Sequence, residues 1–172
     1  MSEAARGFAP VSAPDARVLV LGSLPGVRSL ERAQYYAQPR NVFWRIMGEL
    51  CGAAPELAYE ARLRRLTDAG IALWDVVARA ERPGSLDASI RRATVEVNDF
   101  AGFLGAHAQI ERICFNGRMA ADLFAARVVP SLPAPAPSAV VLPSTSPAHA
   151  GMSFDVKLCH WREQLAFLER AP

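Results

Sequence analysis

The chain has 172 residues, of which 51% are apolar and 21% are charged, and its formal net charge at pH 7 is +2. These values are ordinary for one globular domain with room for a real core. The mild charge permits nucleic-acid binding without demanding it, because local patches matter more than totals. Arginine outnumbers lysine eighteen to one. That bias suits bidentate phosphate contacts, but it also follows from GC-rich coding.

The three cysteines, Cys51, Cys114 and Cys159, are widely spaced and lie in apolar patterns. No pair has the spacing of metal ligands or of a redox motif, so we expect reduced, mostly buried thiols in a cytoplasmic protein. Three cysteines exclude an iron–sulfur cluster held by four. No apolar run reaches membrane-spanning length and no signal-peptide pattern is present, so we expect no membrane partner.

Short aliphatic runs alternate with stretches of helical periodicity along the chain. Residues 1–16 are rich in Ala, Pro and Ser and are expected to form a loose arm, followed by a single domain over 17–172. Strands are expected at 17–21, 71–77, 110–115 and 139–142, and helices at 41–50, 56–69, 98–107, 118–127 and 154–170. This alternation predicts an α/β fold in which helices cover both faces of a parallel sheet. Long loops are expected at 22–40 and 79–95.

Two segments that directly follow aliphatic runs carry most of the functional information. The first is Gly22–Gly26 (GSLPG), followed ten residues later by Tyr36–Trp44 (YAQPRNVFW), and the second is Leu142–His149 (LPSTSPAH). Open α/β sheets bind ligands at the carboxyl ends of their strands, so these segments predict a shared cleft. The first segment lacks the glycine spacing of a dinucleotide-binding turn and the Gly-Lys-Ser/Thr ending of a phosphate loop.

The order of these motifs resembles that of the uracil-DNA glycosylase superfamily, over about residues 17–168. Tyr36–Met47 is similar to the mismatch-specific uracil/thymine glycosylases. Leu142–Ala148, Leu73–Val76 and Gly84–Asp87 look more like the hypoxanthine (deoxyinosine) DNA glycosylase branch. The resemblance implies a three-layer α/β/α sandwich with a central four-stranded parallel sheet and no metal.

The resemblance also implies a monofunctional DNA glycosylase of base excision repair that removes a deaminated base, hypoxanthine first and uracil second. Such an enzyme flips the nucleotide out of the duplex, hydrolyses its N-glycosidic bond with water and leaves an abasic site. The sole lysine, Lys157, lies in the last predicted helix, which argues against Schiff-base chemistry and strand cleavage. The expected partner is DNA containing deaminated bases, bound by a monomer without cofactors.

Residues of the first motif and of the second strand are expected to bind the extruded base. Tyr36 matches the family position whose ring stacks on the base, with core packing as the alternative. The resemblance implies that backbone N–H groups of Ser23 and Leu24, in the turn that begins at Gly22, could donate to O6 of hypoxanthine. Asp75, as a carboxylate, could accept N1–H of hypoxanthine or N3–H of uracil. Its alternative role is a cap of a helix or turn.

Two polar groups that are usual in the superfamily are missing. Leu24 stands where many members carry an Asn or Asp that positions the water, and Leu142 stands where several carry a His that stabilises the departing base. The resemblance makes Asn41 the candidate catalytic residue, because it matches the Asn of the superfamily's Pro-x-Asn-x-Phe-Trp segment and the hypoxanthine branch likewise lacks both groups. At a helix N-terminus its amide could hold a water below the sugar or donate to the base, acting by positioning and polarity. Its alternative role is that of a helix N-cap.

The second motif is expected to bind DNA beside the lesion. Pro143 stiffens this loop, while the hydroxyls of Ser144, Thr145 and Ser146 and the backbone N–H groups could bind flanking phosphates. A small side chain of the loop could wedge into the minor groove. The alternative is an ordinary Ser/Pro turn. His149 could contact phosphate or the leaving base, or simply lie at the surface. Arginines that could contact phosphates near the cleft are Arg28, Arg40, Arg82 and Arg118.

Three alternative functions stay open at this point. A uracil or mismatch-specific glycosylase would keep the chemistry and change the substrate. A catalytically inactive module of the same fold would bind damaged DNA without turnover. An unrelated α/β enzyme would act equally well on free nucleosides, although the Pro-Ser-Thr-Ser loop favours DNA.

Overall fold

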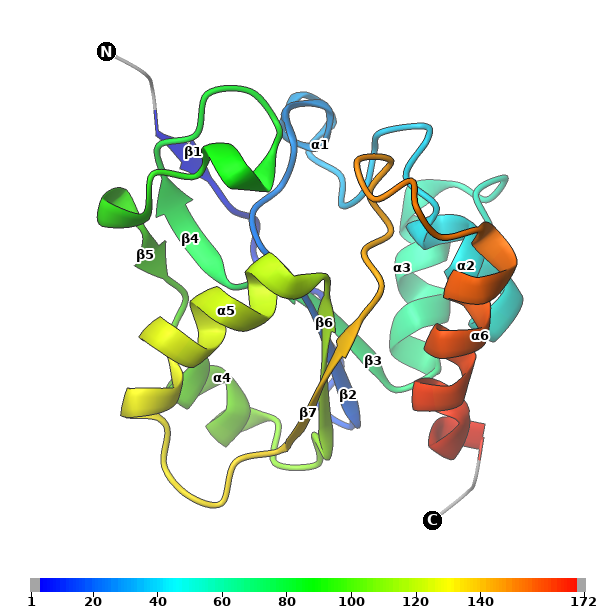
Figure 1. Ribbon diagram of the computed structural model, residues 1–172. Helices are drawn as coiled ribbons and strands as arrows, with labels where there is room; N and C mark the ends of the chain where they lie inside the picture. Colours follow the sequence, from blue (N-terminus) through cyan, green and yellow to red (C-terminus); the bar gives the residue numbers. More distant parts are fainter. Residues whose placement is uncertain (1–3, 170–172) are drawn as a thin grey trace.

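A four-stranded parallel sheet forms the centre of the computed structural model, which describes residues 4–169 (Figure 1). Its strands, in the spatial order β3-β2-β6-β7, are β2 (Val18–Gly22), β3 (Ile71–Asp75), β6 (Arg112–Asn116) and β7 (Ser138–Leu142). Leu19 lies level with Ala72 of β3 on one side and with Ile113 of β6 on the other. All three strand pairs are parallel, so the four carboxyl ends meet at one edge of the sheet.

Helices cover both faces of this sheet, which gives three layers (Figure 1). On one face lie α4 (Phe100–Ala106) and α5 (Arg118–Arg127). On the other lie α2 (Phe43–Cys51), α3 (Tyr59–Asp68) and α6 (Phe154–Leu165). The predicted α/β/α sandwich with a four-stranded parallel sheet is confirmed.

Alternate side chains of β2 enter two separate cores. Leu19 and Leu21 join the cluster under α4 and α5, which includes Phe100, Phe103, Leu123 and Phe124. Val18 and Val20 join the cluster under the other three helices, which includes Phe43, Ile46, Leu66 and Trp161. Full burial of a large apolar side chain contributes about 1.5–3 kcal/mol. The strand that carries the first motif is thus fixed from both sides.

A second, antiparallel sheet lies beside the first and was not predicted. It consists of β1 (Ala5–Arg6), β4 (Val77–Ala80) and β5 (Glu96–Val97), in the order β1-β4-β5. The predicted strand over 71–77 therefore ends as β3 at Asp75, and the chain enters the second sheet at Val77. The predicted loop over 79–95 contains two 3-10 turns, η1 (Asp87–Ser89) and η2 (Arg92–Thr94).

The N-terminal segment is not a loose arm over its described part, residues 4–16. Besides the pairing of β1 with β4, Val11 and Leu73 exchange two backbone hydrogen bonds of 2.9 and 2.8 Å. The indole N–H of Trp74 donates to the carbonyl oxygen of Phe8 at 2.9 Å. Because β3 is an edge strand, this segment satisfies backbone groups that would otherwise be free. Residues 1–3 of the predicted arm lie outside the described residues.

Three local details also differ from the sequence analysis. A short helix, α1 (Val27–Arg32), lies within the stretch predicted as a loop. Helix α4 is capped by Asp99, whose side chain accepts the N–H of Gly102, whereas Asn98 donates to the carbonyl oxygen of Asp75. The closing helix ends at Leu165, and the 3-10 turns η3 (Val129–Ser131) and η4 (Ala166–Glu169) follow α5 and α6.

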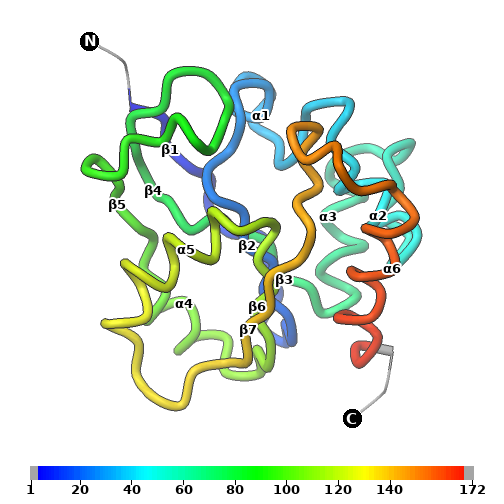
Figure 2. Tube along the Cα trace, in the orientation of Figure 1, coloured from blue at the N-terminus to red at the C-terminus, as the bar shows by residue number. Residues whose placement is uncertain are grey.

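The three cysteines are free thiols, but they differ in burial. Cys114 in β6 is buried, Cys51 at the end of α2 is half-buried and Cys159 on α6 is exposed. The prediction of mostly buried thiols is therefore wrong for Cys159, which lies on the outer side of its helix. Figure 2 shows this helix on the right of the molecule, at the end of the described chain. Within residues 4–169, no helix is long and apolar enough to cross a membrane.

Candidate active site

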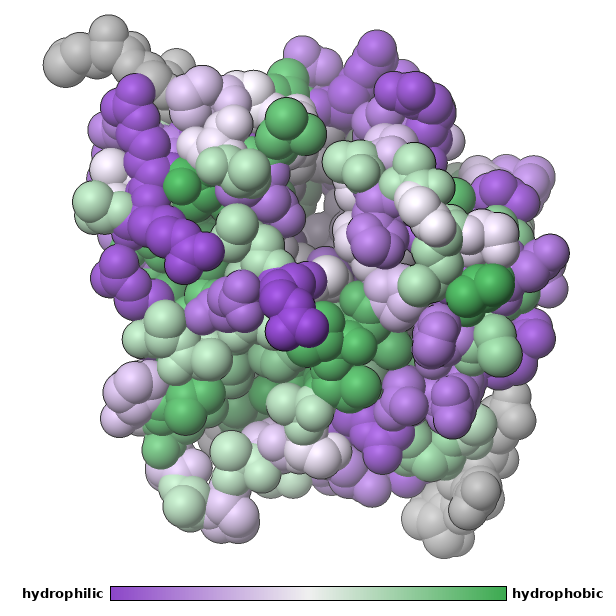
Figure 3. Space-filling view, viewed as in Figure 1, coloured by the Kyte–Doolittle hydropathy of each residue, from purple (hydrophilic) through white to green (hydrophobic). Residues whose placement is uncertain are grey.

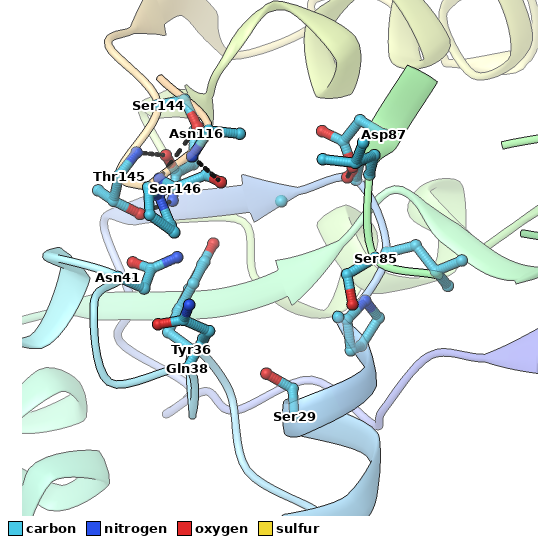
Figure 4. A pocket seen from close by; sticks show the side chains of 18 of the residues that line it. Ser29, Tyr36, Gln38, Asn41, Ser85, Asp87, Asn116, Ser144, Thr145 and Ser146 are labelled. Atoms are coloured by element: carbon cyan, nitrogen blue, oxygen red, sulfur yellow. Dashed lines mark hydrogen bonds between the residues drawn. The ribbon is translucent and has the colours of Figure 1, made fainter. Parts of the chain in front are cut away.

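A cavity of about 300 Å³ opens at the carboxyl edge of the parallel sheet. Figure 3 shows the hollow in the surface, and Figure 4 shows the side chains that surround it. The turn 22–26, the stretch 35–41 and the loop 144–149 all contribute to its walls. The two sequence motifs therefore meet at one cavity. Of the predicted site residues, all line it except Pro143: Gly22, Ser23, Leu24, Tyr36, Asn41, Asp75, Ser144, Thr145, Ser146 and His149.

The turn after β2 is held by the segment that follows β4. Arg82 is only 5% exposed, and its guanidinium donates to the carbonyl oxygens of Leu24 (3.1 Å), Gly84 (2.9 Å) and Pro25. Ser23 Oγ donates to a carboxylate oxygen of Asp87 at 2.6 Å. Because its donors are used inside the protein, Arg82 is not available for the phosphate contact suggested by the sequence. Arg28, Arg40 and Arg118 are exposed.

Replacing Arg82 with methionine should destabilise this turn and the whole fold. The carbonyl oxygens of the buried residues Leu24 and Pro25 and of the exposed Gly84 would lose their donor, and each unsatisfied group that is buried costs roughly 1–3 kcal/mol. We expect the free energy of unfolding, measured in urea, to fall by about 3 kcal/mol in Arg82→Met. Arg28→Met, at an exposed position on α1, is the control and should leave the midpoint unchanged. Equal midpoints for both variants would contradict the structural role of Arg82.

Gly22 lies against the two groups that form the floor of the cavity. A Cβ atom at this position would come within 2.5 Å of Asp75 Oδ1 and 3.0 Å of the hydroxyl of Tyr36. Distances this short exclude any side chain without movement of Asp75 or Tyr36. The glycine thus allows the carboxyl group and the phenol to approach the backbone of the β2 strand end.

Asp75 ends β3 as a buried carboxyl group with an unused oxygen. The residue is 3% exposed, and its Oδ2 atom has no hydrogen-bond partner within the described residues. The pKa of this carboxyl group is raised to about 7, chiefly by burial and then by the nearby charge of Asp87, while the charge of Arg82 acts to lower it. Both protonation states are therefore available near neutral pH. A buried polar atom without a partner, beside a cavity, is a candidate ligand-binding group.

Tyr36 presents an aromatic ring that is supported from behind. Its ring stacks on that of Phe43, with centroids 4.0 Å apart and planes 25° from parallel. The backbone of Tyr36 is left-handed, with φ of 53°. Burial, and then the charge of Asp75, raise the pKa of its hydroxyl, so the phenol stays protonated. The ring therefore packs on the core and also lines the cavity.

Asn41 uses its oxygen and leaves its nitrogen free. The side-chain Oδ1 accepts the backbone N–H of Phe43 at 3.0 Å, at the start of α2. Within the described residues, Nδ2 makes no hydrogen bond. Because the oxygen must face the donor, the amide orientation is fixed and the NH₂ group is left on the cavity side (Figure 4). Asn41 lies one residue before Val42, the N-cap of α2, so its side chain closes the turn into the helix as a cap would and leaves a hydrogen-bond donor to the cavity.

The second motif is held in place by Asn116, the last residue of β6. Asn116 Oδ1 accepts the N–H of Thr145, and its Nδ2 donates to Thr145 Oγ1, both at 2.9 Å (Figure 4). The carbonyl oxygen of Thr145 accepts the N–H of Val42 at 3.1 Å. Thr145 is fully buried, so its hydroxyl belongs to the wall of the cavity and not to a surface that faces DNA.

The neighbours of Thr145 are fixed by the loop and by α6. Ser144 Oγ accepts the N–H of Ser146 at 3.2 Å. The carbonyl oxygen of Pro143 accepts the indole N–H of Trp161, which holds this proline outside the cavity. The buried ammonium of Lys157 donates to the carbonyl oxygen of His149 at 2.8 Å. The imidazole of His149 is left at the exposed rim.

Some lining residues were not predicted as site residues. Those with polar side chains are Ser29, Tyr35, Gln38, Ser85, Asp87 and Asn116. Two of them had a signal in the sequence, because Asp87 ends the quoted Gly-Ser-Leu-Asp motif and Asn116 directly follows a predicted strand. Within residues 4–169, no group of three or more His, Cys, Asp or Glu side chains could hold a metal ion.

Comparison with known proteins agrees with this architecture. The family model of the uracil DNA glycosylase superfamily matches residues 9–166. A hypoxanthine DNA glycosylase from Methanosarcina acetivorans is 41% identical over 118 residues, which cover 68% of this chain and 73% of the relative. A hypoxanthine DNA glycosylase from Methanosarcina barkeri is 35% identical over 118 residues with the same coverage.

A solved structure matches over almost the whole chain. It is the solution NMR structure of a Methanosarcina acetivorans protein proposed to be a uracil DNA glycosylase, with a TM-score of 0.81 and 34% identity. The match covers 98% of this chain and 100% of the other. Sequence, fold and the cavity at the carboxyl edge of the sheet agree, and the chain belongs to the uracil DNA glycosylase superfamily.

Proposed function

We propose that this protein is a monofunctional DNA glycosylase that removes hypoxanthine, and second uracil, from DNA. The observation that carries the proposal is a cavity lined by three groups. They are the supported aromatic ring of Tyr36, the buried carboxyl group of Asp75 and the side-chain NH₂ group of Asn41. The cavity volume of about 300 Å³ suits one small ligand. The relatives named as hypoxanthine DNA glycosylases support the choice of lesion.

In this proposal, stacking provides affinity and Asp75 reads the edge of the base. An extruded base stacks on the face of the Tyr36 ring that Phe43 does not cover, a contact worth about 1–3 kcal/mol. Asp75 accepts N1–H of hypoxanthine. When protonated, it also donates to O6, so that its unused Oδ2 gains a partner. Uracil offers the same N–H and C=O edge, which explains why it is the second substrate.

Asn41 stabilises the departing base. The bond to Phe43 occupies its oxygen, so the group that faces the cavity is a donor and not a base. A donor strengthens its bond as negative charge develops on the leaving base, and this lowers the barrier to an oxocarbenium-like transition state. Asn41 would thus take over the role of the histidine that Leu142 replaces. Water is the nucleophile, and the protein acts as a monomer without a cofactor.

The proposal is tested with labelled duplexes that contain one deoxyinosine or one deoxyuridine. We expect abasic sites to form faster from deoxyinosine, with strand cleavage only after alkali, because the sole lysine is buried and bonded to a carbonyl oxygen. EDTA should not change the rate. Binding without release of either base would support the inactive DNA-binding module and overturn the enzyme. Equal activity on free deoxyinosine would point instead to a nucleoside hydrolase.

A further inference from the structure

A second cavity, of about 660 Å³, adjoins the base cavity. The two share Tyr36, Gln38 and Asn41, so the stretch 36–41 forms a wall between them. The second cavity extends over α2 and across the connection 54–56 to α3, and the start of α6 closes it at Phe154. Figure 2 shows these segments side by side in the upper right of the molecule. We call this second cavity the arginine groove.

Three arginines line the arginine groove without an acidic partner. Within the described residues, Arg32, Arg45 and Arg62 take part in none of the ion pairs, which join other arginines to glutamates. Two glutamates, Glu49 and Glu56, also line the groove. The positive side chains outnumber the negative ones, and their charges are not neutralised by contact.

Two of these arginines are held in place by aromatic rings. The guanidinium of Arg45 lies 4.0 Å from the ring centroid of Phe154. That of Arg62 lies 4.7 Å from the centroid of Trp44 and 5.3 Å from that of Tyr59. Arg62 Nε is buried and has no hydrogen-bond partner within the described residues. Stacking limits the motion of a guanidinium before any ligand arrives, so less conformational entropy is lost when an anion binds.

We propose that the arginine groove binds the phosphodiester backbone of the damaged strand next to the extruded nucleotide. The inference rests on the proposed function. The groove is separated from the base cavity only by the stretch 36–41, so a strand whose base enters one cavity passes the other. Guanidinium groups match the geometry of phosphate oxygens. The groove would fix the register of the strand and leave the choice of base to the first cavity.

The test measures how salt weakens DNA binding. The probe is a fluorescent duplex whose single deoxyinosine carries a 2′-fluoro-arabino sugar, which resists hydrolysis. Each phosphate contact contributes about 0.9 to the slope of log K against log salt concentration. We expect Arg45→Gln and Arg62→Gln each to reduce the slope by about one and to weaken binding several-fold at low salt. Arg64→Gln is the matched control, because Arg64 is exposed on the same helix as Arg62 and does not line the groove.

Placement on the strand is tested with neutral phosphates. Single methylphosphonates on either side of the lesion should weaken binding by the wild type at one or two positions. At these positions the methylphosphonate should not weaken binding by Arg45→Gln any further. Unchanged slopes in both groove variants, or an equal loss in Arg64→Gln, would overturn the proposal. Arg45 is exposed, so its variant keeps the test valid if Arg62→Gln fails to fold.

The same measurements separate this inference from the proposed function. Phosphate contacts do not depend on the base, so the slope should fall equally for an undamaged duplex. If hypoxanthine is not released but the slopes change as expected, the groove stands and the enzymatic proposal fails. If hypoxanthine is released but the salt dependence of binding is unchanged in the groove variants, only the proposal for the arginine groove is overturned. Tighter binding of the wild type to an acidic peptide than to DNA, with the peptide binding lost in the groove variants, would also contradict it.

Discussion

Asn41→Asp should keep the fold and lose most of the glycosylase activity. Aspartate caps a helix as well as asparagine does, so its carboxylate can still accept the N–H of Phe43. It cannot donate to the departing base, and it adds a negative charge where negative charge develops. Loss of one such donor typically costs 10²- to 10³-fold in rate. Single-turnover release of hypoxanthine, measured beside thermal unfolding, checks both parts.

Asn41→Ala is the companion variant. It removes the cap and the donor together, so it should lose activity as Asn41→Asp does and also about 1 kcal/mol of stability. Near wild-type release by both variants would mean that Asn41 is only a cap. If Asn41→Asp released hypoxanthine faster than the wild type, the side chain at this position would act as a base that activates water. That result would overturn the role of Asn41 as a donor to the leaving group.

The rate of hypoxanthine release should fall above pH 7 in the wild type and not in Asp75→Asn. Burial raises the pKa of Asp75 to about 7, so its proton is lost above that pH. Only the protonated group can donate to O6, and an ionised carboxylate would repel the departing anion. The expected fall is about tenfold per pH unit. An asparagine keeps one donor and one acceptor at every pH, so the profile of the variant should be flat.

The groups around Asp75 set the controls for this profile. The charge of Asp87 raises the pKa of Asp75, and the charge of Arg82 lowers it. The charge of Asp75 in turn helps to raise the pKa values of the Tyr35 and Tyr36 hydroxyls, so both phenols stay protonated near pH 7. A rate that rises through pH 7 would show that the ionised form reads the base. Identical profiles for wild type and Asp75→Asn would show that another group titrates.

The same substitution should stabilise the fold at alkaline pH. The carboxyl group of Asp75 has a pKa of about 7 in the folded state and of about 3.8 in the unfolded chain, so the folded state binds the proton more tightly. The contribution of this carboxyl group to the free energy of unfolding is therefore at its maximum below about pH 4, and it is lost as the pH rises to about 7. Asp75→Asn carries no such loss and should gain a few kcal/mol, in order of magnitude, at pH 8. Urea unfolding at pH 5 and pH 8 measures this, and an equal effect at both would contradict it.

The central sheet was predictable because its strands are short apolar runs with both faces covered. All four were found, as were the helices that begin near Phe43 and Arg118. The second sheet was missed because β1 and β5 have only two residues each, and their pairing uses backbone groups that no side-chain pattern reveals. For the same reason the Ala/Pro/Ser-rich composition of residues 1–16 predicts a loose arm, although residues 4–16 pair through their backbone.

The site was predictable where its residues directly follow strands. Gly22, Asp75 and the loop after β7 all lie at the carboxyl edge for that reason. The role of Arg82 was not predictable, since its three carbonyl partners include two that lie nearly sixty residues away. The burial of Thr145 likewise depends on Asn116, from another strand.

The hydrogen bonds from Asn116 to Thr145 and from Val42 to Thr145 join three walls of the cavity into one unit. A pocket built this way is formed before DNA arrives, and little of the protein has to rearrange around the base. Most of the free-energy cost of forming the complex then comes from the duplex, which must unpair, unstack and bend. The speed of repair should therefore follow how weakly the lesion is paired: deoxyinosine opposite a poorly matched base should be removed faster than deoxyinosine opposite cytosine.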